Sequence, residues 1–352
     1  MKKNKVISLL ATTALVASFA SAANAQTTIT GSVGSAFLVG DVSAPAGSNI
    51  IAPKSLVNTS AFTIAHKSKL SNGMDVNISQ EITSGEADTF GGRNIAVTVA
   101  KGIDVGYSFD GVQGSEIART PTPFVTERNQ TIHNRGGIVG FLDVTSSEHF
   151  LYTNITGILP LNARLSVAYM PNTSVNRAAN TTMNKFSTAE GNASKGYGVG
   201  LTLSPIAGLT VSAGQTTIDH RAETHQDGNG KAIGLRYSTG PISVGAQKFT
   251  NKGLATGQAG TQTDEVTTFS ATYAIDKALS IGVYQATQER NVAGTKSTVD
   301  TRQRGFQVGY NLGPALLSYD YDKASDTPAS GTVNATRGRD IDVHKVRFNV
   351  AF

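Results

Sequence analysis

The stretch Val343–Phe352 reads VHKVRFNVAF and ends the chain on an aromatic residue. Apolar side chains recur at every second position, and polar or small side chains stand between them. Successive side chains of a β-strand point to opposite faces, so this strand has one apolar face and one polar face. An unpaired strand of this kind recruits other chains. The pattern therefore favours a last strand that closes a barrel, with lipid outside and water inside.

The first 25 residues have the pattern of a secretory signal peptide. Lys2, Lys3 and Lys5 form a basic region, residues 6–20 are mostly apolar and small, and residues 23–25 read Ala-Asn-Ala. The alternative is a transmembrane anchor, but the apolar stretch is short and is broken by Ser and Thr. We therefore predict export with cleavage before Gln26. The chain has no cysteine, which excludes both disulfides and attachment of lipid to a cysteine.

Removal of residues 1–25 changes the charge balance of the chain. The mature part has 352 − 25 = 327 residues and a formal charge of 27 − 25 = +2, since the signal carries three lysines and no acid. A near-neutral chain gives no support for nucleic-acid binding. No later apolar run approaches 18 residues, so no membrane-spanning helix is expected. The 37 glycines suit twisted strands and turns, although an array of β-sandwiches would share this composition.

Alternation of apolar and polar side chains recurs along the whole mature chain, at the spacing of an all-β protein. It predicts a transmembrane antiparallel β-barrel over residues 26–352. The turns and loops between the alternating segments give 16 strands, with 14 or 18 as alternatives. The expected strands begin near residues 27, 56, 74, 93, 103, 146, 163, 196, 209, 231, 241, 265, 279, 302, 315 and 341.

The predicted connections alternate between short and long. Tight turns are expected at residues 71–73, 101–102, 157–162, 205–208, 240, 276–278 and 313–314, where Gly, Asn and Pro supply the backbone angles. Longer polar segments are expected at 42–55, 84–92, 111–145, 171–195, 220–230, 251–264, 290–301 and 324–340. Short turns on one edge and long loops on the other are typical of outer-membrane barrels, on the periplasmic and extracellular sides respectively.

With its terminal Phe352 and its 16 strands, the chain resembles the trimeric general porins of the Gram-negative outer membrane, closest in style to α-proteobacterial porins. In those proteins the third long loop folds inward and narrows the pore. Here the third long loop, residues 111–145, is also the longest, although it lacks the PEFGG run of enteric porins. The resemblance implies an outer-membrane homotrimer, in contact with membrane lipid, that passes small hydrophilic solutes and ions.

Charged residues of the predicted lumen fall into two groups. By strand parity the inward basic residues of the wall include Lys67, Lys69, Arg236, Lys345 and Arg347, and Arg164 also points inward. The inward acids by the same parity are Asp75, Glu81, Asp104, Asp110, Asp320 and Asp322. The long loop contributes Glu116, Arg119, Glu127, Arg128, Arg135 and Asp143. We hypothesise that Glu116 and Glu127 face basic groups across a constriction, which would create a transverse field. The alternative places many of these charges at the solvated rims, where Arg93, Arg302 and Arg304 are expected.

Other functions receive less support from the sequence. Neither a GxSxG elbow nor a P-loop is present, so no catalytic residue and no cofactor is predicted. His220 and His225 could bind a cation, but a solvated loop is the better interpretation, and no metal site is predicted. The main alternatives are a substrate-specific channel, which would need an aromatic track in the lumen, and a surface adhesin or structural barrel. Tyr284 and Phe249 are the few inward aromatic candidates.

Overall fold

The computed structural model describes residues 26–43, 54–84, 89–109, 149–174, 193–220, 227–252, 262–292, 295–296, 300–327 and 339–352. Its strands are β1 (Gln26–Ser43), β2 (Lys54–Lys69), β3 (Asp75–Ser84), β4 (Thr89–Ala100), β5 (Ile103–Phe109), β6 (His149–Thr156), β7 (Arg164–Ser174), β8 (Ala193–Leu203), β9 (Leu209–His220), β10 (Gly228–Thr239), β11 (Ile242–Lys252), β12 (Gln262–Ala274), β13 (Leu279–Val292), β14 (Thr295–Lys296), β15 (Thr301–Asn311), β16 (Ala315–Thr327) and β17 (Arg339–Ala351). A short 3-10 turn, η2 (Pro160–Asn162), precedes β7. Within these ranges, no helix has the length and hydropathy that a membrane crossing requires.

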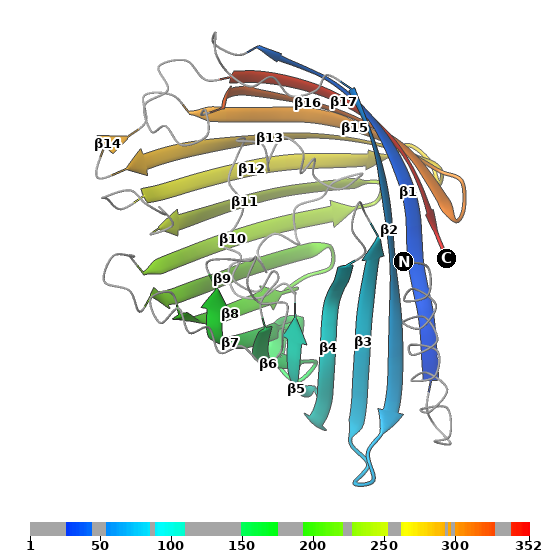
Figure 1. Ribbon diagram of the computed structural model, residues 1–352, viewed down its shortest axis with the longest axis vertical. Coiled ribbons are helices and arrows are strands. Elements are labelled where there is room, and N and C mark those ends of the chain that lie inside the picture. Colours follow the sequence, from blue (N-terminus) through cyan, green and yellow to red (C-terminus); the bar gives the residue numbers. More distant parts are fainter. Residues whose placement is uncertain are drawn as a thin grey trace, which may run out of the picture.

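The strands form one antiparallel sheet in which each strand pairs with its neighbours in the chain, and β1 also pairs with β17. Figure 1 shows β1 lying between β2 and β17, where the sheet closes on itself. The two-residue β14 pairs only with β13, so sixteen strands make up the barrel. This confirms the predicted fold and strand number. The largest error in a strand start is at β4, which was expected near residue 93 and begins at Thr89.

The exposed and buried faces of the strands separate by residue type. The large exposed apolar side chains lie on one face of most wall strands, with Ile29 at 59%, Val283 at 58% and Phe269 at 59% exposure. The opposite face carries the buried polar groups, such as Thr216, Gln303 and Asp320. In a closed barrel the first face is the outside and the second is the inside. The register keeps this assignment consistent around the whole barrel, because inward residues pair with inward residues at every seam.

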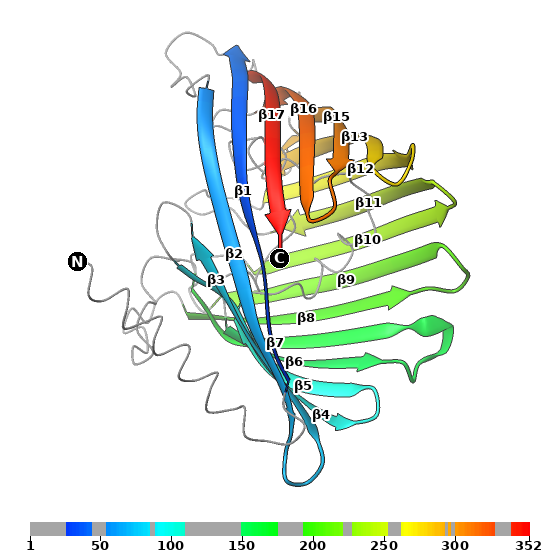
Figure 2. The same ribbon diagram turned by 90° about the vertical axis from the view of Figure 1, so that its right-hand side faces the viewer.

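The tight turns lie where the sequence predicted them, and the hairpins β8–β9 and β10–β11 turn at the same edge of the barrel (Figure 2). Six of these turns contain a glycine with positive φ, such as Gly73 at 85° and Gly313 at 88°. The turn between β12 and β13 instead uses Asp276, whose carboxylate accepts hydrogen bonds from the backbone N–H of Leu279 and of Ala278, each 2.7 Å long. These two bonds hold the pKa of Asp276 below its ordinary value.

The C-terminal residue completes the seam between the first and last strands. Phe352 and Gly31 exchange two backbone hydrogen bonds, of 2.8 and 2.9 Å. The Phe352 ring lies directly over Gly31, because a Cβ atom on that glycine would come within 2.8 Å of the ring atom Cζ. A larger residue at position 31 would push the ring away, so the glycine and the terminal aromatic fit each other. This confirms Phe352 as an outward residue of the closing strand.

We predict that Phe352→Ala lowers the free energy of unfolding by about 1 kcal/mol more than Phe269→Ala does. Both side chains point outward and are similarly exposed, at 65% and 59%, but only Phe352 spans the closing seam. Urea unfolding of both variants after refolding into lipid vesicles measures the difference and avoids cellular assembly. Equal losses would show that the terminal ring contributes only its lipid contact.

Candidate functional site: the inner wall of the barrel

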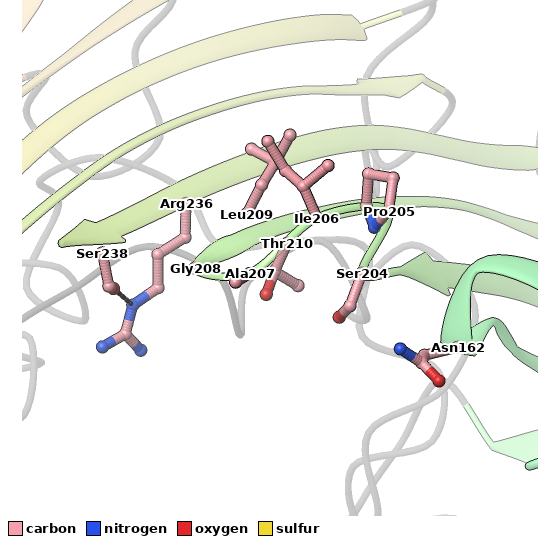
Figure 3. Close-up of a pocket in the computed structure, with 10 residues that line it drawn as sticks. All are labelled: Asn162, Ser204, Pro205, Ile206, Ala207, Gly208, Leu209, Thr210, Arg236 and Ser238. Carbon is pink, nitrogen blue, oxygen red and sulfur yellow. Dashed lines mark hydrogen bonds between the residues drawn. The ribbon is translucent and has the colours of Figure 1, made fainter.

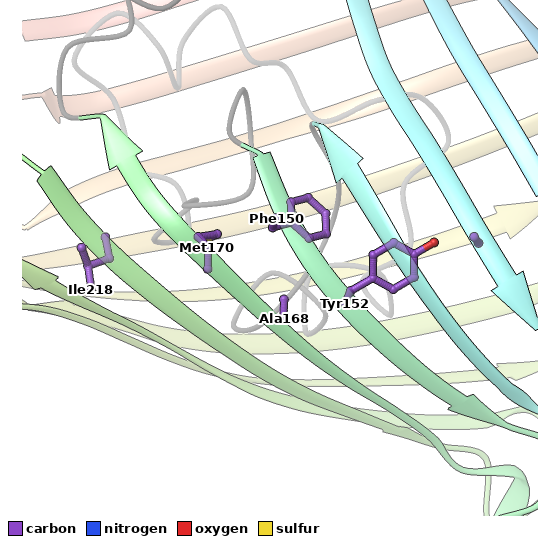
Figure 4. Close-up of a cluster of buried hydrophobic side chains, with 6 residues drawn as sticks. Phe150, Tyr152, Ala168, Met170 and Ile218 are labelled. Carbon is purple, nitrogen blue, oxygen red and sulfur yellow. The ribbon is translucent and has the colours of Figure 1, made fainter. Parts of the chain in front are cut away.

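The inner wall, meaning the inward side chains of the sixteen long strands, is mostly polar or small. Its buried polar members are Ser108, Ser166, Ser212, Thr216, Gln247, Asn251, Asp264, Thr268, Ser270, Gln288, Thr301, Gln303, Gln307, Ser318, Asp320, Asp322 and Lys345. Three buried apolar clusters interrupt it, one each on β4–β9, β10–β13 and the closing strands β16, β17 and β1. Figure 4 shows the first of these, built around Phe150, Tyr152 and Met170.

In the structure the predicted basic residues of the wall point inward, but they lie at different levels along the strands. Lys345 and Arg347 pair with Leu38 and Ala36 of β1, whereas Lys67 pairs with Gln26. Ala36 and Gln26 are 36 − 26 = 10 residues apart, which is about 33 Å along a strand. The four basic residues of β2 and β17 therefore share one arc of the barrel, as expected from closure, but they do not form a ring at one level.

Acidic neighbours accompany the basic residues of this arc. Lys69 forms a salt bridge with Asp75 across the β2–β3 turn, with 2.6 Å between Nζ and Oδ1. Lys345, itself only 9% exposed, stands directly opposite Asp320 in the β16–β17 register. Opposite charges at directly paired positions stabilise an antiparallel pair of strands. The arc from β16 to β3 is therefore mixed in charge, with the inward acids Asp75 and Asp320 beside the predicted basic residues.

The predicted charges of the long loop cannot be compared with this arrangement. Glu116, Arg119, Glu127, Arg128, Arg135 and Asp143 all lie outside the described residues, as does Asp110. Arg93 is outward, as expected for a rim residue, and its Nε donates a 2.8 Å hydrogen bond to Gln80 Oε1. Arg302 and Arg304 are also outward, opposite Thr287 and Gln285 of β13.

The other side of the barrel has a different charge pattern. Along the inward positions of β7–β11, the described residues include Arg164 and Arg236 but no Asp or Glu. The remaining inward positions of β8–β10 are largely Gly, Ser and Thr, as in the run Gly196, Gly198 and Gly200. Small side chains leave the lumen wide on this side. Among these described positions the two arginines carry the only formal charges, so this part of the wall contributes a positive potential.

Two inward tyrosines each lie across a glycine of the next strand. A Cβ atom on Gly106 would come within 2.5 Å of Tyr152 Cζ, and Tyr152 donates a 2.6 Å hydrogen bond to Asn94 Oδ1 on β4. The same arrangement recurs on the other side of the barrel. Tyr284 lies over Gly305, where a Cβ atom would come within 2.6 Å of its Cε1, and its hydroxyl donates to Asp322 on β16.

Each of these tyrosines therefore connects three strands, with its ring flat against the wall and not projecting into the lumen. Gln303 Nε2 adds a 2.9 Å hydrogen bond to the Tyr284 hydroxyl. Gln288 Nε2 donates a bond of the same length to Asp264 Oδ1 higher on this wall. These contacts form two polar groups on the β12–β16 part of the inner wall, and each fixes the positions of its side chains.

Sequence parity missed several of these inward residues. Phe150 and Tyr152 were not recognised, because the start of β6 was placed near residue 146 and no alternating face was assigned to it. Asp264 and Gln303 could have been found from parity alone, since they lie opposite the outward faces that contain Phe269 and Phe306. In the described part of the chain, no group of three His, Cys, Asp or Glu side chains could hold a metal ion.

Comparisons with known proteins agree with this architecture. A family model described as Gram-negative porin matches residues 11–327. Among solved structures, an anion-selective porin from Comamonas acidovorans is 12% identical, with a TM-score of 0.69 and coverage of 94% of this chain and 100% of that one. A trimer form of OmpT, an outer membrane protein of Vibrio cholerae, is 10% identical, with a TM-score of 0.61 and coverage of 92% and 99%. A mutant of Rh. blastica porin is 11% identical, with a TM-score of 0.60 and coverage of 93% and 100%. A search of curated protein sequences found no match.

We predict that Tyr284→Phe lowers the free energy of unfolding by about 2 kcal/mol, because it removes the donor to a buried carboxylate. The ring remains and still covers Gly305, so the loss reports the hydroxyl alone. Tyr310→Phe is the matched control, since Tyr310 is outward and 45% exposed, and it should change stability by less than about 0.5 kcal/mol. Urea unfolding in lipid vesicles measures both variants, and equal values would contradict the assigned role of the Tyr284 hydroxyl.

Proposed function

The chain belongs to the Gram-negative porin family, and from this premise we propose that its outer-membrane barrel is a general diffusion pore for small hydrophilic solutes and ions. A closed barrel of sixteen strands leaves a lumen that side chains cannot fill. The observation that carries the proposal is the chemistry of the inner wall, which combines Gly, Ser and Thr on β8–β10 with fixed charges elsewhere. Such a surface is wet and selects solutes by size and charge.

The inward aromatic residues also favour a general pore over a substrate-specific one. Among the described residues they are Phe150, Tyr152, Phe249 and Tyr284, on β6, β11 and β13. Phe150 and Tyr152 lie on one strand with their ring centroids 5.9 Å apart, whereas Phe249 and Tyr284 lie on two other strands, β11 and β13. The hydroxyls of both tyrosines are bonded to the wall. These rings do not form a continuous track for a sugar. We also propose that the barrel has no enzymatic activity.

We propose further that residues 111–145 fold into the lumen and constrict it, with Glu116 and Glu127 facing basic groups of the wall. Support comes from the buried apolar clusters on the inner wall, such as Phe249 and Val266 at 1% and 0% exposure. Apolar patches on the wall of a water-filled lumen are surfaces on which a long inward loop with its own apolar residues would pack.

Export and assembly complete the proposed function. The first strand begins at Gln26, so cleavage before this residue would leave every strand of the barrel intact. The resemblance to porins that form trimers, together with the trimer form of OmpT, supports a homotrimer for this chain. The outward face would then contact membrane lipid and neighbouring subunits.

Liposome swelling tests the general pore. Vesicles that contain the purified protein should take up neutral sugars at rates that fall smoothly with sugar size, because a wall of small and charged residues has no preferred sugar. Protein-free vesicles are the control. Rapid uptake of one sugar against the size order would favour a substrate-specific channel, and the absence of any swelling would favour an adhesin or a structural barrel.

Single-channel recording tests the constricting loop. We predict that Glu127→Gln changes the ratio of cation to anion permeability, because a carboxylate in the narrowest part of a pore acts on every passing ion. Glu265→Gln is the matched control, since Glu265 faces outward and pairs with Lys248, and it should leave selectivity unchanged. Identical conductance and reversal potential in Glu127→Gln and the wild-type protein would show that Glu127 does not lie in the constriction.

A further inference from the structure

A polar cavity of about 460 Å³ lies on the inner wall at the edge of the barrel where the tight turns gather. It is an open pocket bordered by η2, by the β8–β9 turn and by the end of β10 next to the β10–β11 turn. Its polar lining consists of Asn162, Ser204, Thr210, Arg236 and Ser238, which we call the Arg236 pocket. Figure 3 shows these five side chains directed to one side of the wall, while Ile206 and Leu209 point to the other.

The guanidinium of Arg236 is held in a fixed orientation in this pocket. Its Nε donates a 3.1 Å hydrogen bond to Ser238 Oγ, and Ser238 is itself 2.8 Å from Ser243 Oγ. This bond engages Nε and leaves the two Nη groups for another partner. Among the residues that the structure describes, no carboxylate forms an ion pair with Arg236. A half-buried guanidinium of this kind is suited to bind an oxyanion with two parallel hydrogen bonds.

The surroundings of Arg236 strengthen its positive potential. The described inward positions of β7–β11 carry no acid, and Arg164 begins β7 on the same edge of the barrel. The neighbouring inward groups are hydroxyls, including Thr202 and Ser212, whose oxygen atoms are 2.9 Å apart. Hydroxyls both donate and accept hydrogen bonds, so they can contact an anion and also the hydroxyl groups attached to it. The cavity volume falls in the range of sites for small organic ligands.

We propose that the Arg236 pocket is a binding site for small phosphate-bearing or carboxylate-bearing solutes at the tight-turn mouth of the pore. The Nη groups of Arg236 bind the oxyanion, Ser238 positions the guanidinium, and Ser204, Thr210 and Asn162 contact the rest of the solute. The site rests on the proposed function, since solutes reach it through the lumen. It lies at the opposite edge of the wall from the long loops, so it is separate from the constriction proposed for residues 111–145.

Inorganic phosphate is the probe that tests this site. In planar bilayers, phosphate added to one chamber at constant ionic strength should reduce the chloride current of the wild-type pore in a saturable way. Arg236→Gln should raise the half-blocking concentration by about tenfold or more, since it removes a charge-assisted contact, and should keep the pore open. Arg304→Gln is the matched control, because Arg304 faces outward on β15, and it should be blocked like the wild type.

Equilibrium dialysis of radiolabelled phosphate against the detergent-solubilised protein measures binding without any current. Binding of phosphate by the wild-type protein that is lost in Arg236→Gln and weakened in Ser238→Ala would support the site. This holds even if no current were observed, because that result would reject only the proposed pore. Equal phosphate binding by Arg236→Gln and the wild-type protein would overturn the site, whatever the conductance. An open wild-type pore without phosphate block and without phosphate binding would also reject the site while leaving the general pore intact.

Discussion

The pairing of β1 with β17 is the constraint on which the rest of the structure depends. In a bilayer no water is available to an unpaired backbone N–H or C=O group, so a sheet in a membrane must close. The seam runs from Ser32 opposite Ala351 to Ser43 opposite Asp340, and Phe352 extends it to Gly31. Closure also fixes which side chains of each strand point inward and which point outward. A one-residue slip at any seam would turn a whole strand inside out, so the orientation of one strand fixes that of all the others.

Given this closure, the inner wall is divided into two unlike halves. From β16 through β17 to β3, acids and bases alternate, as in Asp320 opposite Lys345 and Lys69 bonded to Asp75. From β7 to β11 the described inward residues are mostly small, and the larger ones include two arginines, Gln247 and Asn251 of β11 and a few apolar side chains, but no acid. A solute with a dipole therefore meets different fields on the two sides of the lumen. The glycines also accommodate the wall's own aromatic rings, since Tyr152 and Tyr284 lie flat only because Gly106 and Gly305 have no side chain.

Period-two alternation, together with the spacing of turns and loops, was sufficient to predict the fold, the strand number and the inward facing of individual charges. Arg236 was assigned inward by strand parity, and the register pairs it with Gly245 and Thr210, which are inward residues of the neighbouring strands. The positions of these residues along the barrel axis could not be predicted in the same way. Lys67 and Lys345 were assigned to one arc correctly, but their separation along β1 depends on how the strands are staggered, which alternation does not encode. Contacts across three strands, such as Tyr284 to Asp322, were missed for the same reason.

The position of Arg236 next to a tight turn explains why a recessed polar pocket forms beside it. At mid-height the inward residues of one strand are packed against those of both neighbours, as Phe249 is against Ala232 and Val266. Next to a tight turn, one neighbour ends and the chain reverses, so the inward side chains of β10 face the backbone of the β8–β9 turn and η2. Leu161 and Asn162 adopt positive φ angles of 58° and 51° there, which turns the chain sharply enough to border the hollow. A charged group at this edge is close to bulk water, so its desolvation costs less than at mid-height. At the edge of the barrel where the tight turns lie, this wall can therefore hold an arginine without an ion-pair partner that is both ordered and accessible.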